Sequence, residues 1–165
     1  MTVWTERPHE EANLLNPAFC CLGMTAAIAG YQAEANQGLP LGLAYMILPI
    51  TLHKPTRDLL PRNRRTSLPM WIQDNASVRV LFHERLISLK PFTREAILFG
   101  CSRAWITVQN NASLVTDRTE AALRRACQSL EAEPRDCVLK AIFVGRWLAT
   151  AGTPATVMAL WGIQP

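Results

Sequence analysis

The strongest constraint on the fold lies in residues 75–116, where the spacing of apolar side chains changes from helical to strand-like. The first part carries one apolar stripe at helical spacing, formed by Val78, Leu81, Phe82, Leu86 and Leu89. Asn75 is placed to cap this helix, and Pro91 ends it and begins a second helix over residues 92–104. Residues 105–116 then alternate around a polar turn, which predicts a tight hairpin.

Two helices followed by a hairpin is the element order of a winged-helix module. The sequence therefore predicts a mainly α fold with one short β-hairpin, in which a winged-helix-like helix–helix–hairpin core is flanked by N- and C-terminal helices. We expect a single domain, because a chain of 165 residues supports one core. In chain order its parts are a flexible arm (1–8), an N-terminal helical part (9–74), the winged-helix-like module (75–117) and C-terminal helices (118–165).

The N-terminal part contains a strong helix start at Asn16-Pro17, because Asn caps a helix and Pro suits its first position. This helix is rich in small residues, and we expect it to be the buried central helix, ending near Gly38. A turn at residues 37–40 leads into an apolar helix that Pro49 kinks. Shorter helices are predicted on either side of these two, at residues 9–15 and 67–74.

The C-terminal part is punctuated by two further signals. Asp117 and Glu120 have the spacing of a capping box, which predicts a helix from there to about residue 131. Glu133-Pro134 separates that helix from the next. The remaining helices are predicted at residues 135–150 and 154–161.

The composition indicates an interaction with another protein chain. Apolar residues make up 49% of the sequence and charged residues only 18%, below the roughly one quarter usual in soluble domains. A small globule has limited interior, so part of this apolar surface is expected to meet a partner. The alternative is a tightly packed monomer with a lightly charged surface.

The cellular compartment is predicted from cysteine usage and from the lack of targeting signals. The five cysteines form no CxxC pair, which fits buried thiols in a reducing cytoplasm. The N-terminal residues show neither a signal peptide nor a transit pattern. The longest apolar run, residues 39–52, is interrupted by Pro40 and Pro49 and is shorter than the roughly 18 residues of a membrane span. We therefore expect a cytoplasmic protein that does not enter a membrane.

Catalytic motifs are not found. Phosphate-binding, dinucleotide-binding, zincin and hydrolase-elbow patterns have no match, and neither a metal nor a cofactor is indicated. The few acidic residues do not cluster as two-metal nuclease chemistry requires. A thiol nucleophile at Cys20 or Cys21 with His53 is conceivable, but buried helical cysteines are the favoured interpretation. We expect that the protein is not an enzyme.

Nucleic-acid binding is a second hypothesis, which the winged-helix interpretation raises. The predicted recognition helix offers little for base readout beyond Arg94, Ser102 and Arg103, so sequence-specific recognition is disfavoured. Non-specific phosphate contact is more plausible in the most basic segment, through Arg57, Arg62, Arg64 and Arg65. A solvated loop, or a patch for an acidic protein, explains that segment equally well. A stand-alone winged-helix transcriptional regulator therefore stays the alternative function.

An ordered set of short motifs resembles the middle component of bacterial ABC-three-component systems, to which Lamassu-type defence is related. The resemblance covers nearly the whole chain except its first eight residues and residues 117–135. The motifs are Asn16-Pro17-Ala18-Phe19, Gly30-Tyr31, Leu48-Pro49, Leu52-His53-Lys54-Pro55-Thr56-Arg57, Leu60-Pro61, Pro91-Phe92-Thr93-Arg94-Glu95-Ala96, Gly145-Arg146-Trp147, Ala151-Gly152-Thr153-Pro154-Ala155-Thr156 and Gly162.

This resemblance implies a non-enzymatic adaptor subunit in anti-phage or anti-plasmid defence. Its expected partners are an SMC-like coiled-coil ABC ATPase and an effector subunit, often a nuclease, with non-specific DNA contact as a further option. The residues implied in partner contact, or in folding the contact surface, are Asn16, His53, Thr56, Arg57, Arg146 and Trp147. Arg57 and Arg146 rank first, because no role in the fold is evident for either from the sequence.

Overall fold

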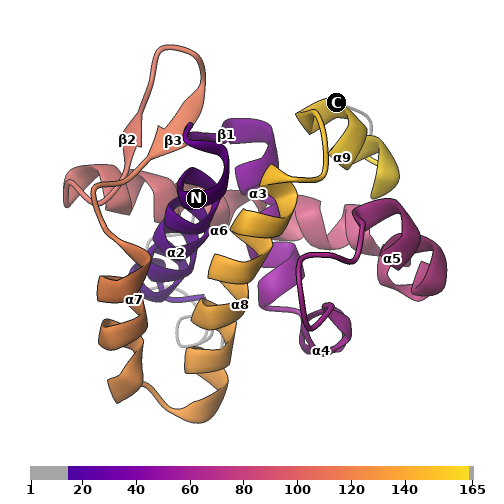
Figure 1. Cartoon of the computed structure of the whole chain (residues 1–165). Coiled ribbons are helices and arrows are strands. Elements are labelled where there is room, and N and C mark those ends of the chain that lie inside the picture. The colour runs from indigo at the N-terminus through magenta and orange to yellow at the C-terminus, as the bar shows by residue number, and fades with distance from the viewer. Residues whose placement is uncertain (1–14, 164–165) are drawn as a thin grey trace.

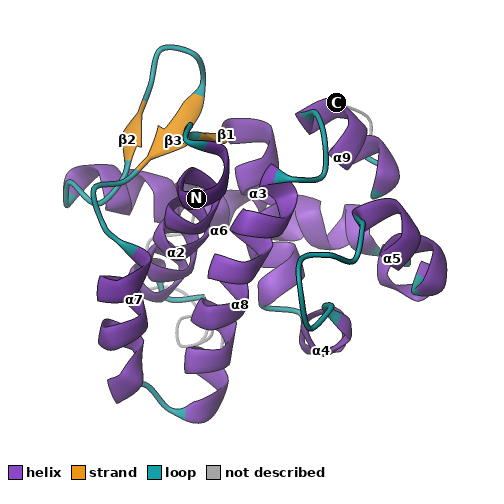
Figure 2. Cartoon of the chain, in the orientation of Figure 1, coloured by secondary structure: helices purple, strands orange, loops and turns teal. Residues whose placement is uncertain are grey.

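The structure is a computed structural model that describes residues 15–163; the predicted arm and the helix at 9–15 lie outside this range, apart from Leu15. The described residues are mostly helical, with one small antiparallel sheet, as predicted (Figures 1 and 2). The α-helices are α2 (Pro17–Ala35), α3 (Leu41–Thr51), α4 (Lys54–Leu59), α5 (Leu68–Asp74), α6 (Phe82–Ser102), α7 (Glu120–Ala126), α8 (Ala132–Ala149) and α9 (Pro154–Leu160). Short 3-10 helices, η2 (Ala76–Arg79) and η3 (Cys127–Ser129), precede α6 and follow α7.

Helix α2 is the central helix that the sequence predicts. Asn16 caps it, since the side-chain oxygen accepts a hydrogen bond from the backbone N–H of Ala18 at 2.8 Å. The helix packs most extensively against α8 and α6 (Figure 1). Gly30 lies directly beneath the backbone of α8, and Gly145 of α8 lies against the backbone of α2. The small residues therefore serve a close helix crossing.

The sheet brings together segments that are far apart in the chain. Strands β2 (Thr107–Val108) and β3 (Ser113–Val115) form the predicted hairpin. A third strand, β1 (Leu39–Pro40), pairs antiparallel with β3, so the strand order is β1-β3-β2. The turn predicted at residues 37–40 is thus partly wrong, because its second half adds a strand to the hairpin. Helix α3 starts directly from β1 and contains Pro49.

The two helices predicted on either side of Pro91 are wrong, because one continuous helix, α6, runs through it. An internal proline costs a helix roughly 3 kcal/mol, and the packing of α6 along α2 and α3 overrides that preference. The predicted cap at Asn75 is also wrong: its side chain donates to the carbonyl of Trp71 and so closes α5. The helix pair required by a winged helix is therefore not seen, and that arrangement is not confirmed.

The C-terminal helices differ from the prediction at two caps. Thr119, rather than Asp117, caps α7, since its hydroxyl accepts from the N–H of Ala122 at 3.2 Å. Helix α8 starts at Ala132, so Glu133-Pro134 lies in its first turn, where proline is tolerated. The last helix, α9, starts at the capping residue Thr153 as expected. Among the described residues, every helix is too short or too polar to cross a membrane.

Candidate partner-binding surface

His53 and Thr56 form the start of α4. The Nδ1 atom of His53 accepts the backbone N–H of Thr56 at 3.3 Å and lies 2.8 Å from its hydroxyl oxygen. The guanidinium of Arg85 contacts the same ring nitrogen. Burial, and then the positive charge of Arg85, lower the pKa of His53 and favour the neutral ring that can accept these bonds. Both residues therefore shape the helix start.

Arg57 is a buried structural residue, with only 2% of its side chain exposed. Its Nε donates to Asp136 Oδ2 and its Nη2 to Glu133 Oε1, both at 2.8 Å. Its Nη1 donates to the carbonyl of Thr51 at 2.9 Å. These bonds fasten α4 to the end of α3 and to the first turns of α8. Arg57 therefore has a role in the fold that was not evident from the sequence.

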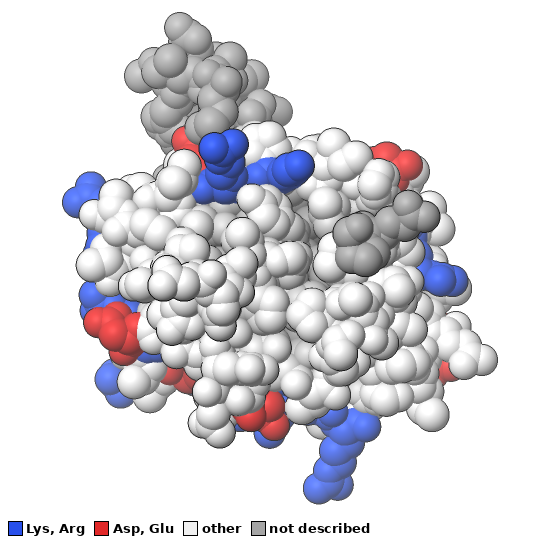
Figure 3. Space-filling model, turned by 90° about the horizontal axis from the view of Figure 1, so that it is seen from above, with Lys and Arg blue, Asp and Glu red and all other residues white. Residues whose placement is uncertain are grey.

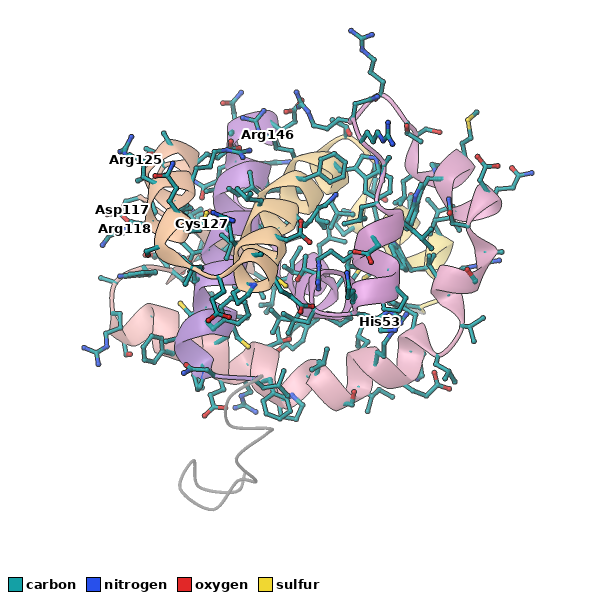
Figure 4. All side chains as sticks on the ribbon, turned by 90° about the horizontal axis from the view of Figure 1, so that it is seen from below. His53, Asp117, Arg118, Arg125, Cys127 and Arg146 are labelled. Atoms are coloured by element: carbon teal, nitrogen blue, oxygen red, sulfur yellow. The ribbon has the colours of Figure 1, made fainter. Side chains whose placement is uncertain are left out.

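Arg146 also has a role in the fold that the sequence did not reveal. Its guanidinium pairs with Glu120 of α7 and, at 3.5 Å, with Glu34 of α2. Arg64 reaches the same carboxylate of Glu34 from the α4–α5 connection. Arg146 therefore holds three helices together at a half-exposed network, far from His53 in the view of Figure 4.

Trp147 belongs to the core. Its indole N–H donates to the carbonyl of Thr66 at 2.8 Å, and its ring meets that of Trp71 edge-on at 5.2 Å. Asn16 lies at the start of α2 as a cap. The structure therefore brings His53, Thr56 and Arg57 together at α4 and places Asn16, Arg146 and Trp147 elsewhere. Direct contact of any of the six with a partner stays a prediction.

The basic segment offers fewer free cations than its sequence suggests. Arg57 is buried and Arg64 is paired with Glu34. Arg62 and Arg65 are exposed, and their side chains form no ion pair within the described residues. Non-specific phosphate contact through this segment would therefore depend mainly on Arg62 and Arg65, and it stays a prediction.

The cysteines implied in thiol chemistry lie in an unfavourable setting for it. Burial, with Glu95 and Cys21 as lesser causes, raises the pKa of Cys20 to about 12. Burial also raises the pKa of Cys21. His53 is engaged with Thr56 and Arg85 rather than with either thiol. Within residues 15–163, no group of His, Cys, Asp and Glu is placed to hold a metal ion.

One broad face of the molecule is almost free of charge. Figure 3 shows it with Lys, Arg, Asp and Glu confined to its margins. Three long charge-free stretches of sequence, residues 35–52, 104–116 and 147–163, supply the hairpin, the β1–α3 start and α9 that lie on this side in Figure 1. A depression at their junction, here called the uncharged hollow, is lined by Tyr31, Gln37, Gly38, Pro40, Asn111, Ser113, Ala149, Gly152, Thr153 and Pro154.

A mainly apolar groove adjoins this face across α9. The groove, here called the α5–α9 groove, is lined by Pro69, Ile72, Gln73, Arg79, Thr156, Ala159 and Leu160. Met70 of α5 is 61% exposed, and Val80 and Leu81 are exposed between η2 and α6. Leu81 has a left-handed backbone (φ 54°), which is costly for a leucine. Exposed apolar side chains next to a groove are typical of a protein interface.

These surfaces were missed at the level of single residues because no individual side chain marks them. The sequence shows the three charge-free stretches, but a longer one, residues 12–33, includes most of the buried helix α2, so lack of charge alone does not mark a surface. That the three stretches meet on one face depends on the pairing of Leu39 with Leu114 and on the return of the chain from α8 to α9. Depletion of charge is the compositional mark of an interface core.

The family model for the ABC-three component (ABC-3C) system Middle Component 3 matches residues 4–165. The chain belongs to this family. No curated protein and no solved structure matches it. A middle component is one subunit of a multi-component system, so the family implies partner subunits for the surfaces described above. The motif at residues 151–156 contributes Gly152, Thr153 and Pro154 to the uncharged hollow and Thr156 to the α5–α9 groove.

Proposed function

We propose that this chain is a non-enzymatic adaptor subunit that links an SMC-like ABC ATPase to an effector subunit, often a nuclease, in bacterial defence against phages or plasmids. The family supports the accessory role, since it is the middle component of a three-component system. The adaptor works through its surface, by holding its two partners in a complex whose geometry the ATPase changes.

The observation that carries this proposal is the uncharged hollow together with the adjoining α5–α9 groove. The charge-free segments of the chain gather there, while its charged side chains lie at the margins (Figure 3). This face lacks the charged groups that cost most to desolvate, so a partner can cover it more readily than a charged surface. Gln37, Asn111 and Thr153 in the hollow offer that partner hydrogen-bonding groups. Its extent over the hairpin, α3 and α9 suits a macromolecular partner better than a small ligand.

The roles of the predicted residues follow from their positions in the fold. Arg57, His53 and Thr56 fix α4, and Arg146 fixes α7 and α2 against α8. Trp147 fills the core beneath the α4–α5 connection, and Asn16 starts α2. We propose that these residues maintain the shape of the contact surface, and that the uncharged hollow and the groove make the contacts.

The alternative function, a stand-alone transcriptional regulator, would need a DNA-binding surface, and neither the hairpin nor the helix before it favours one. The hairpin segment, residues 104–116, carries no cation for phosphate contact. The helix that precedes it is continuous through Pro91, whereas a winged helix needs two helices there.

Co-purification of the chain with the ATPase and effector components of its system tests the proposal. We expect Ala159→Glu, which places a charge in the α5–α9 groove, to weaken binding of the affected partner at least tenfold. Ala126→Glu is the matched control, because Ala126 is an exposed alanine on α7, away from both surfaces. Circular dichroism and thermal melting establish that both variants are folded.

A wild-type chain that binds neither component would contradict the adaptor function. Equal binding by the Ala159→Glu variant and the wild type would show that the α5–α9 groove is not part of the contact surface.

A further inference from the structure

Helix α6 has a second stripe, apolar except for one arginine, which faces away from the core. Its core face carries Phe82, Thr93, Ala96 and Gly100, all buried. The opposite side, here called the outer stripe of α6, consists of five exposed residues: Ile87, Pro91, Arg94, Leu98 and Cys101. Ile87 is 54% exposed and Leu98 is 56% exposed. Figure 4 shows α6 along one edge of the molecule, with the other helices on one side of it.

The spacing of the outer stripe is that of a helix–helix seam. Successive members are four, three, four and three residues apart, the alternation that places side chains at the a and d positions of two heptads. Fourteen residues of α-helix span about 21 Å. An exposed seam of this length fits the side of another helix crossing at a shallow angle.

The charges on α6 indicate the character of that helix. Arg94 lies at the centre of the stripe, is exposed, and forms no hydrogen bond or ion pair within the described residues. Lys90 of α6 and Arg103, directly after its end, are also exposed. Between residues 87 and 103 the only carboxylate is that of Glu95. It lies close enough to the buried thiol of Cys20 in α2 to raise the pKa of that thiol, although burial is the larger cause. An acidic partner helix therefore complements the stripe.

The same arginine argues against pairing of two copies of the chain through this stripe. In a symmetric pair that aligns the five positions, parallel or antiparallel, Arg94 meets Arg94 of the other copy. Like charges facing each other in a desolvated seam are unfavourable. A single polar residue at a core position instead fixes register with a complementary partner.

We propose that the outer stripe of α6 binds an amphipathic, acidic helix from another component of the same system, with a carboxylate of that helix opposite Arg94. This inference rests on the proposed adaptor function and adds a second contact surface to it. Pro91 lacks a backbone N–H, so the carbonyl of Ile87 loses its intrahelical donor. That carbonyl belongs to a residue of the stripe and is an additional acceptor for the partner.

Cys101 supplies a direct test in the unmodified protein, because it is exposed while Cys20, Cys21, Cys127 and Cys137 are buried. Its alkylation by a maleimide is measured in the isolated chain and in the complex with the other components. We expect alkylation to slow at least tenfold in the complex. An unchanged rate in a fully formed complex would overturn the docking proposal and leave the adaptor function standing.

Charge reversal tests the role of Arg94. We expect Arg94→Glu to weaken the complex at least tenfold, and Arg125→Glu, the control on exposed α7, to bind like the wild type (Figure 4). A photo-cross-linking residue in place of Ser102, beside the stripe, identifies the segment of the partner that lies there. Changing the acidic residue of that partner segment to Arg is expected to restore binding by the Arg94→Glu variant.

Three results would overturn the docking proposal: undiminished binding by Arg94→Glu, a cross-link to a segment without an acidic residue, or a cross-link to a second copy. If the wild-type chain forms no complex at all, the adaptor function fails and this proposal fails with it.

Discussion

At the residue scale, the arginines show how far sequence reasoning reaches. Arg57 and Arg146 rank first from the sequence because no role in the fold is evident there. The structure gives each a specific role, and the carboxylates that they contact lie 26 to 112 residues away in the chain. Such pairing leaves no local pattern, so a buried structural arginine and a free binding arginine look the same in sequence.

The contrast between Arg57 and Arg62 gives a prediction about stability. Replacing Arg57 by Ala removes the hydrogen bonds of a buried guanidinium to two carboxylates and to the carbonyls of Thr51 and Leu52. We expect a loss of about 2–3 kcal/mol in the free energy of unfolding. Arg62→Ala, at an exposed position, is expected to change it by less than about 0.5 kcal/mol. Urea unfolding of the wild type and the two variants measures both values. Equal free energies of unfolding for all three would show that the hydrogen bonds of Arg57 do not stabilise the fold.

At the element scale, helices with clear caps were predicted well. The starts of α2 and α9 and the hairpin match the expectation, because Asn16, Pro17, Thr153 and the polar turn act locally. Helix α5 also starts where expected, although the side chain of Ser67 forms no capping hydrogen bond. The errors come where tertiary contacts override local signals. Pro91 does not end α6, because packing against α2 and α3 holds the helix together. Strand β1 exists only through its pairing with the distant β3, which residues 37–40 alone do not reveal.

The close crossing of α2 and α8 gives a prediction at this scale. A Cβ at Gly30 would overlap the carbonyl oxygen of Ile142, whereas a Cβ at Gly23, in the same helix, would have no atom within 4 Å. We expect Gly30→Ala to destabilise the protein by about 1–3 kcal/mol through overpacking. Gly23→Ala is expected to stabilise it by up to about 1 kcal/mol, because alanine favours a helix. Thermal unfolding ranks the two variants, and the reverse order would contradict the described crossing.

At the scale of the whole molecule, the composition predicted an interface but not its place. The low share of charge is visible in the sequence. The gathering of the charge-free stretches on one face follows from the antiparallel β1–β3 pairing and from the turn between α8 and α9. The individual residues ranked first from the sequence lie away from that face, in α4 and in the α2–α7–α8 network. A contact surface was therefore predictable as a hypothesis, whereas its residues required the fold.

Hydrogen exchange of the chain, alone and in complex with the ATPase and effector components, tests the central claim most directly. We expect the backbone amides of the hairpin turn, residues 109–112, and of α9 to exchange more slowly in the complex, because a partner covers the uncharged hollow and the α5–α9 groove. The connection between α7 and α8, residues 127–131, is the internal control and should be unchanged. Unaltered exchange in the hairpin turn and α9 of a fully assembled complex would contradict the account.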